Sequence, residues 1–234
     1  MKKNLFKDIS IIAHRGLHNQ KISENSILAF REACKKNMPI ELDIHLLQDH
    51  NIIVYHDDYV KVKNKKKPLK EITYQQLQTD FPLNNSEIPL FKTALEEVNG
   101  KVPILIEIKT DQKFKKLEKE TIKILKNYKG LYFIQSFRLR SILYLKRKLH
   151  CKVGLLIHTK TNTQKNWFFN SIILKILKID FLSYPFKNIP NKKIEKLNKK
   201  IPVLLWTIHN QEEQKRAEKY CDAIIFENTS CEIN

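Results

Sequence analysis

The feature of this sequence that most restricts its fold is a regular alternation between short apolar runs and amphipathic segments. The apolar runs are rich in Ile, Val, Leu and Phe, as expected of parallel strands covered on both faces. Eight such runs occur, at Ile9–Ala13, Ile40–Leu46, Val102–Ile108, Leu131–Gln135, Val153–Ile157, Asp180–Ser183, Ile201–Thr207 and Ala223–Phe226. Helical segments between them are expected at Ser26–Lys36, capped by Asn25, and at Phe91–Val98, Asp111–Asn127, Phe137–Leu149, Asn191–Lys199 and Gln211–Lys219.

This alternation predicts an α/β fold of the (β/α)8 TIM barrel type, and a chain of 234 residues falls within the usual size of that fold. An open, doubly wound sheet is the structural rival, but it normally carries a glycine-rich phosphate loop after its first strand. The chain has four glycines in all and no loop of that kind. We therefore expect one barrel domain over residues 1–234, with a short insertion between the second and third strands.

The predicted insertion covers His56–Val102 and includes a small helix around Tyr74–Thr79. Just before it, the apolar run Asn51–Tyr55 is expected to form an extra strand. The lysine-rich stretch Lys61–Lys70 is expected to be an exposed, solvated loop. An insertion this short would leave the barrel mouth open to varied substrates.

The charge of the chain is strongly basic, with a formal net charge of +18. Lysine supplies 37 of the 43 basic residues and arginine six, whereas base reading and bidentate phosphate binding favour arginine. We therefore expect no specific nucleic-acid partner, and the abundance of Lys, Ile and Asn is typical of an AT-rich genome. The charge would still attract anionic small molecules and give weak contact with anionic membrane surfaces.

Cysteine content and hydropathy narrow the class of protein further. The four cysteines are scattered and no two have zinc-finger spacing. No stretch approaches the roughly 20 apolar residues of a membrane span, and the N-terminal residues lack the apolar core of a signal peptide. These features predict a cytoplasmic protein.

Ionisable side chains cluster where the predicted strands end. His14 and Arg15 follow the first strand, and the carboxyl ends of barrel strands face the active site. In the second strand, Glu41, Asp43 and His45 alternate with apolar residues, so all three point to the same side and two carboxylates are expected inside the barrel mouth. Buried carboxylates are costly unless they are paired, protonated or bound to a cation.

The next strand and the loop before it add three more such groups. Glu107 and Lys109 lie two residues apart among apolar neighbours, and His56 ends an apolar run. Three carboxylates favour Mg²⁺ or Ca²⁺ over zinc, two histidines can transfer protons near neutral pH, and the two cations suit an anionic substrate. Together they predict metal-assisted cleavage of a phosphate ester.

The chain resembles the glycerophosphodiester phosphodiesterase family in an ordered series of motifs that spans nearly its whole length. The motifs are Ala13-His14-Arg15-Gly16, Glu24-Asn25-Ser26 with Ala29-Phe30, Glu41-Leu42-Asp43-Ile44-His45, Val54-Tyr55-His56-Asp57, Glu107-Ile108-Lys109, Gln135-Ser136-Phe137 and Trp206-Thr207. The resemblance implies a (β/α)8 barrel that uses a divalent cation to hydrolyse glycerophosphodiesters to sn-glycerol 3-phosphate and an alcohol.

The resemblance also implies a role for each matching residue. His14 and His56 match the acid–base pair, and Glu41, Asp43 and Glu107 match the metal ligands. Arg15 and Lys109 match phosphate-binding positions. Trp206 matches an aromatic residue that lines the substrate pocket, and packing in the barrel core is the alternative for this side chain.

Three segments depart from the family pattern. Asp58–Lys63 lacks the Arg-Thr pair that often follows the second histidine, and His209 stands where asparagine is common. The last strand ends in Phe226-Glu227 rather than Thr-Asp, and the longer Glu227 is not equivalent to aspartate. These changes affect positions thought to set specificity more than the proposed catalytic set.

Two alternatives stay open at this level. One is a lysophospholipase D-like hydrolase of lysophospholipids or glycerophosphate polymers. The other, from a different class, is a non-catalytic basic barrel that binds anionic surfaces. The apolar run Trp167-Phe168-Phe169, followed by Ile172-Ile173-Leu174, fits core packing, a dimer face or lipid contact. The sequence does not fix the oligomeric state.

Overall fold

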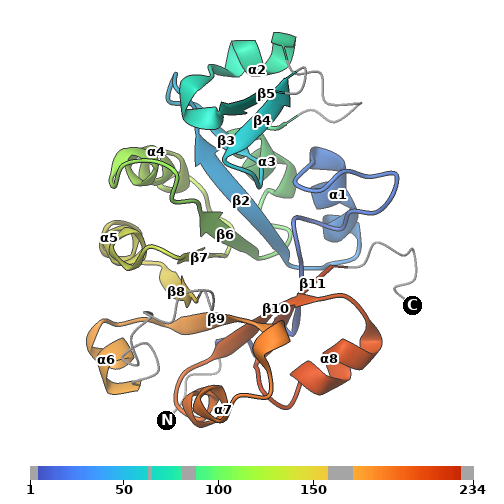
Figure 1. Ribbon diagram of the computed structural model, residues 1–234, viewed down its shortest axis with the longest axis vertical. Coiled ribbons are helices and arrows are strands. Elements are labelled where there is room, and N and C mark those ends of the chain that lie inside the picture. Colours follow the sequence, from blue (N-terminus) through green and yellow to red (C-terminus); the bar gives the residue numbers. More distant parts are fainter. Residues whose placement is uncertain (1–4, 63–64, 81–87, 158–170, 228–234) are drawn as a thin grey trace.

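In the computed structural model, which describes residues 5–62, 65–80, 88–157 and 171–227, eight parallel strands close into a barrel surrounded by helices (Figure 1). Around the barrel the strands are β1 (Ile11–Ala13), β2 (Ile40–Leu46), β6 (Ile104–Ile108), β7 (Tyr132–Ser136), β8 (Lys152–Leu156), β9 (Phe181–Pro185), β10 (Val203–Ile208) and β11 (Ala223–Phe226). Because β1 pairs with both β11 and β2, the barrel is closed. The (β/α)8 prediction is confirmed.

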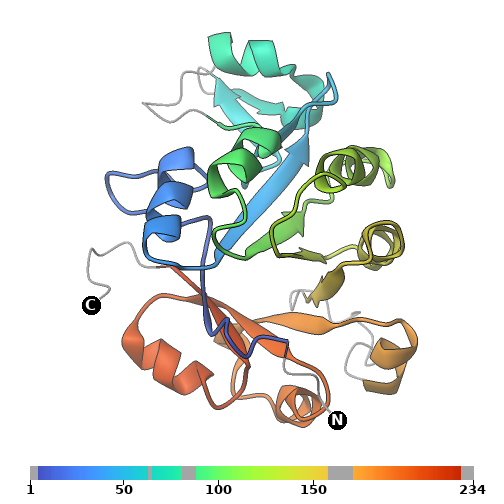
Figure 2. The ribbon, with the colours of Figure 1, turned by 180° about the vertical axis from the view of Figure 1, so that it is seen from behind.

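The helices that surround the barrel pack their apolar faces on the strands. They are α1 (Ile27–Lys35), α3 (Phe91–Val98), α4 (Lys116–Leu125), α5 (Leu139–Leu149), α6 (Ser171–Ile176), α7 (Lys192–Asn198) and α8 (Gln211–Ala217), with a 3-10 turn η3 (Phe186–Asn188) after β9. Seen from behind, α1 and α3 lie side by side (Figure 2).

Two of the helix starts that differ from the sequence prediction bear on the barrel mouth. Ser26, not Asn25, caps α1, because the Ser26 hydroxyl accepts the amide of Ala29 at 3.1 Å. Helix α4 begins at Lys116, five residues after the predicted start at Asp111. Both Asn25 and Asp111 are used instead for contacts at the barrel mouth, as described below.

The insertion between β2 and β6 forms a small satellite at one end of the molecule (Figure 1). Strand β3 (Ile52–Val54) pairs antiparallel with β2, as the run Asn51–Tyr55 predicted. It is followed by the hairpin β4 (Tyr59–Val62) and β5 (Lys65–Pro68), the 3-10 turn η1 (Leu69–Glu71) and helix α2 (Tyr74–Asp80). These elements share a hydrophobic cluster formed by Leu47, Ile53, Val60, Leu69, Ile72, Leu77 and Ile88.

The prediction of an exposed loop at Lys61–Lys70 was wrong, because this stretch contains the second half of β4 and all of β5. Val60 is fully buried while Lys61 is exposed, which is the alternation of a strand with one covered face. Lys66 also places its ammonium 4.1 Å from the ring centre of Tyr59 on the opposite strand. The high lysine content hid this alternation.

Inside the barrel, side chains form an apolar layer below a polar one. The apolar layer contains Ile12, Leu105, Phe133, Phe181, Leu204 and Ile225 and is closed from below by Phe6, whose ring centre lies 5.3 Å from that of Phe181. Residues two positions further along a strand point to the same side. The next inward layer is therefore formed by His14, Glu107, Gln135, Ser183, Trp206 and Glu227.

The structure describes only the second part of the apolar segment singled out after β8, from residue 171 onward. Trp167, Phe168 and Phe169 lie outside the described residues. On α6, Leu174 is buried, while the side chains of Ile172 and Ile176 are 66% and 73% exposed. None of the helices in the described ranges combines the length and the apolar character needed to cross a bilayer.

Candidate active site

A cavity of about 610 Å³ opens at the carboxyl ends of the barrel strands. This volume is in the range of small-molecule sites. All eight residues that the sequence singled out line it, namely His14, Arg15, Glu41, Asp43, His56, Glu107, Lys109 and Trp206. The structure therefore brings together side chains from strands far apart in the sequence.

Three carboxylates converge at the bottom of this cavity. Strand pairing places Asp43 of β2 directly beside Glu107 of β6, and Glu41 lies two residues before Asp43 on the same face. One oxygen from each lies within 4.8 Å of the others, and all three residues are buried. Three hard oxygen ligands at this spacing suit a divalent cation such as Mg²⁺ or Ca²⁺.

Two cations lie against these carboxylates. The Lys109 ammonium is 2.7 Å from Asp43 Oδ1 and 2.8 Å from Glu107 Oε1. Arg15 Nε is 3.5 Å from Asp43 Oδ2, and the backbone amide of Arg15 donates to Glu41 Oε2 at 3.1 Å. The cluster is thus a buried network of alternating charges rather than three isolated acids.

The pKa values of the cluster reflect how unevenly the charges are compensated. Burial acts to raise the pKa of Asp43, but Lys109 and Arg15 outweigh it and lower that pKa. Burial also opposes the charge of Lys109, and Asp43 with Glu107 reverses this and raises the pKa of the ammonium. For Glu41, burial and the charges of Asp43 and Glu107 raise the pKa well above its ordinary value. A bound cation would favour the charged form of Glu41, so this raised pKa fits a site for a cation.

His14 is oriented by the last residue described on the chain. Its Nδ1 donates to Oε2 of Glu227 at 2.7 Å, and this hydrogen bond lowers the pKa of Glu227 to about 2. Because Nδ1 carries the proton in this contact, Nε2 is the nitrogen left to exchange a proton with a ligand. The longer side chain of Glu227, a departure from the family pattern, reaches His14 without difficulty.

His56 is positioned from two directions. Its Nδ1 bonds to Oδ1 of Asp57 at 2.8 Å. Its backbone carbonyl accepts a hydrogen bond from Nε2 of His45 at 3.1 Å, and His45 Nδ1 bonds in turn to Oδ1 of Asp111 at 3.0 Å. His45 is 1% exposed, so it acts as a buried link between β2, the loop that carries His56 and the loop after β6.

The loop after β1 holds Arg15 in a left-handed backbone conformation, with φ 53°. The next residue, Gly16, has φ 80°, and a Cβ there would lie 2.8 Å from that of Ala29, so only glycine fits. The guanidinium of Arg15 donates from Nη1 to both oxygens of Glu24 at 2.8 Å. This pairing leaves Arg15 aimed across the carboxylate cluster.

Asn25 was predicted to cap a helix but has a different role. It adopts a left-handed conformation with φ 53° and donates from Nδ2 to Oδ2 of Asp43 at 3.0 Å. The contact orients a carboxylate of the cluster. An Asn two residues before a helix predicts a cap, so a sequence pattern alone could not have found this role.

Trp206 lies between the barrel core and the cavity. Its side chain packs on the apolar layer inside the barrel and also lines the cavity. Its ring makes an edge-to-face contact with Phe137, with ring centres 6.3 Å apart. The ring therefore forms an apolar wall beside the charged groups.

Sequence reasoning assigned no role to four further residues at this site: Glu24, His45, Asp111 and, as a partner of His14, Glu227. The period of two predicted that His45 shares a face of β2 with Glu41 and Asp43, but it gave no contact for the imidazole. Asp111 was assigned to a helix, and Glu24 gives no periodic signal because it lies in a loop.

Comparison with known proteins agrees with this geometry. Residues 14–230 match the family model described as the glycerophosphoryl diester phosphodiesterase family. A glycerophosphodiester phosphodiesterase of Caldanaerobacter subterraneus is 28% identical over 240 residues, covering 96% of each chain.

Solved structures show the same fold at lower identity. A glycerophosphodiester phosphodiesterase from Thermotoga maritima has a TM-score of 0.77 and 23% identity, covering 93% of this chain and 94% of that one. An Oleispira antarctica phosphodiesterase, solved with the product sn-glycerol-3-phosphate, has a TM-score of 0.74 and 20% identity, covering 93% and 92%.

The barrel and the family match define a phosphodiester hydrolase. More narrowly, the chain belongs to the glycerophosphoryl diester phosphodiesterase family. Enzymes of this family generally depend on a divalent cation, and the acidic cluster offers one a site.

Proposed function

We propose that the chain hydrolyses glycerophosphodiesters to sn-glycerol 3-phosphate and an alcohol with Mg²⁺ or Ca²⁺ held by Glu41, Asp43 and Glu107. The observation that carries the proposal is one cavity in which these buried carboxylates face two fixed cations and two oriented histidines. When bound, the cation supplies charge neutralisation at the phosphate. The product assigned to this chain is that of its family, and the arrangement of these side chains in one cavity supports the assignment.

Arg15 and Lys109 are assigned to the phosphate. An ammonium has three N–H donors, and Lys109 directs two of them at Asp43 and Glu107, which leaves one for a phosphate oxygen. Arg15 is braced by Glu24 through Nη1, so its remaining donors are held in a fixed plane. Trp206 offers an apolar wall for the glycerol carbons.

His14 and His56 are assigned to proton transfer. Each has Nδ1 engaged by a carboxylate, Glu227 for His14 and Asp57 for His56. Each Nε2 is then the exchanging nitrogen, so one histidine takes the proton of the attacking oxygen and the other protonates the leaving alcohol. Assistance of this kind contributes about 10²–10⁴-fold per residue.

The experiment measures release of glycerol 3-phosphate from glycerophosphocholine and glycerophosphoethanolamine with Mg²⁺, with Ca²⁺ and with chelator. We expect cation-dependent release that is lost in His14→Ala and in His56→Ala, both still folded. The matched control is His50→Asn, since His50 is 68% exposed and Asn tolerates its left-handed backbone. Near-normal turnover in either histidine variant would refute the acid–base assignment.

No release with any cation, from folded protein, would contradict the proposed substrate. The same assay would then move to lysophospholipids and to glycerophosphate polymers.

A further inference from the structure

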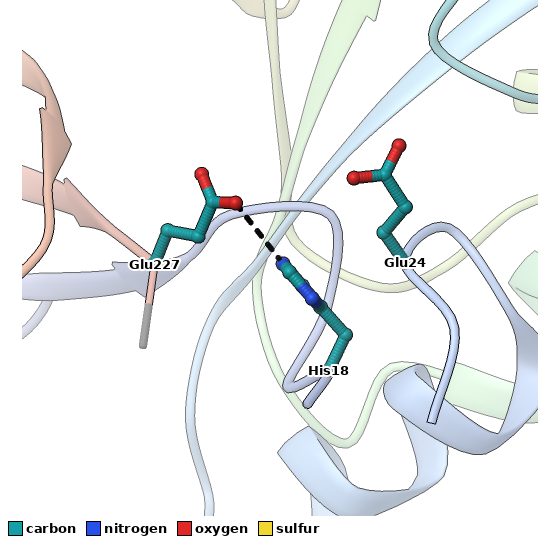
Figure 3. Close-up of side chains that lie close together, drawn as sticks. All are labelled: His18, Glu24 and Glu227. Carbon is teal, nitrogen blue, oxygen red and sulfur yellow. Dashed lines mark ion pairs between the residues drawn. The ribbon is translucent and has the colours of Figure 1, made fainter. Parts of the chain in front are cut away.

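A second cluster of metal-ligating side chains lies beside the active site. It is formed by His18 and Glu24 from the loop after β1 and by Glu227 after β11 (Figure 3). One ligand atom from each side chain lies within 4.8 Å of the others. None of these three residues belongs to the acidic cluster of Glu41, Asp43 and Glu107.

His18 provides an independent sign that something binds here. Its side chain is 9% exposed, and its Nε2 has no hydrogen-bond partner among the residues that the structure describes. Oε1 of Glu227 lies 3.8 Å away, within reach of an ion pair but too far for a hydrogen bond. Buried polar nitrogens are almost always paired, and Figure 3 shows this ring directed at the Glu227 carboxylate, with Glu24 on the other side of the cluster.

The two carboxylates keep lone pairs free for a further ligand. Glu227 uses Oε2 for His14 and turns Oε1 toward His18. Glu24 accepts Nη1 of Arg15 on both oxygens, but a carboxylate has about four lone-pair positions. Glu24 is 41% exposed and Glu227 20%, so the cluster also has a path to solvent.

We propose that His18, Glu24 and Glu227 bind a divalent transition metal, of the Mn²⁺ or Zn²⁺ type, in a site separate from the all-oxygen site of the active centre. One imidazole nitrogen with two carboxylate oxygens is a donor set that such ions accept and that Mg²⁺ and Ca²⁺ rarely use. Bonds of about 2.1 Å to a tetrahedral ion place its ligand atoms about 3.4 Å apart, so the three side chains would have to draw together from their present limit of 4.8 Å to bind the ion.

The electrostatics of His18 support the same site. Burial lowers the pKa of His18, which favours the neutral imidazole that binds metals. Arg15 touches both clusters, since its Nη1 pairs with Glu24 while its Nε lies 3.5 Å from Asp43. The two sites are thus neighbours that share no ligand.

The test uses Mn²⁺ as the probe, with equilibrium dialysis for stoichiometry and pulsed EPR for nitrogen coupling. We expect two Mn²⁺ per wild-type chain, with ¹⁴N coupling on one of them. The double variant Glu41→Gln/Asp43→Asn should keep one ion, with the coupling. His18→Gln should keep one ion without it, and His50→Asn should behave as wild type.

The proposal is overturned if the wild type shows no ¹⁴N coupling, or if the coupling persists in His18→Gln. It is also overturned if the double variant binds no Mn²⁺. Should His18→Gln fail to fold, the presence or absence of coupling in the wild type still decides. The outcome is independent of the proposed hydrolysis, which relies on the acidic cluster and is measured by product release.

Discussion

At the scale of single residues, Glu227 has the most consequential contact that the family pattern did not predict. It replaces a shorter aspartate and still holds Nδ1 of His14 at 2.7 Å. The carboxylate accepts a hydrogen bond from Nδ1 and so fixes the tautomer of His14. In the proposed mechanism it would also stabilise the imidazolium formed when His14 accepts a proton.

Replacing Glu227 by Gln tests this dependence. We expect kcat to fall by about 10²–10⁴-fold, because an amide neither balances the imidazolium nor enforces its tautomer. The measurement is steady-state release of glycerol 3-phosphate, with Glu212→Gln on the exposed face of α8 as the matched control. An unchanged kcat would mean that His14 does not depend on Glu227.

The same residue gives a pH-dependent contribution to stability. Its pKa is about 2 when folded, below the ordinary value of 4.5, so it stabilises the protein above pH 4.5 and this contribution is lost as pH falls toward 2. In chelator, the difference in unfolding free energy between wild type and Glu227→Gln should therefore shrink over that range. Urea unfolding at several pH values measures it, and a constant difference would contradict the assigned pKa.

Side-chain directions were predictable where a period of two could be applied. Glu41, Asp43, Glu107 and Lys109 alternate with apolar neighbours, so their shared direction followed from the strand geometry. Asn25 was misassigned because its role depends on a left-handed backbone and on a strand that is 18 residues away. Local sequence carries no sign of either condition.

At the scale of elements, the site depends on how loops are tied to strands. His45 joins β2 to the carbonyl of His56 and to Asp111 in the loop before α4. We expect His45→Ala to lower kcat about tenfold or more while cation affinity stays the same, since His45 supports the loop that carries His56, the residue proposed for proton transfer. The double variant with Asp111→Ala should be no worse than His45→Ala, because both belong to one chain of contacts. Additive losses would indicate separate roles, and calorimetry with Mg²⁺ measures the affinity.

Elements whose sequence shows a clear apolar pattern were predicted correctly, whereas the hairpin whose pattern is obscured by lysines was not. The barrel strands are apolar through most of their length, a pattern typical of parallel strands that are covered on both faces. The hairpin β4–β5 is rich in lysine, and its pairing depends on a cluster completed by Leu77 and Ile88 from distant segments. Such a cluster is visible only once the chain has folded.

At the scale of the whole molecule, the side chains of the apolar layer fill the inside of the barrel closely. Gly154 of β8 lies beside Phe181 of β9, and a Cβ at Gly154 would be 2.0 Å from the Phe181 ring. The ring occupies the space that the missing side chain leaves. Packing this tight tolerates no added methyl group without movement.

A double-mutant cycle at this contact tests the packing. We expect Phe181→Ala to cost about 3–5 kcal/mol and Gly154→Ala to destabilise the wild type by about 1–3 kcal/mol. In the Phe181→Ala background, Gly154→Ala should be neutral or stabilising, because it partly fills the cavity. Equal costs in both backgrounds would show that the two residues do not compete for space.

The layering inside the barrel has an evolutionary consequence. Packing and chemistry occupy alternate positions of the same strands, with Leu105 below Glu107 and Ile225 below Glu227. Mutation can therefore exchange the upper residue of a strand while the lower residue preserves the register. A lineage built on this barrel can therefore change the side chains at its mouth without putting its foldability at risk.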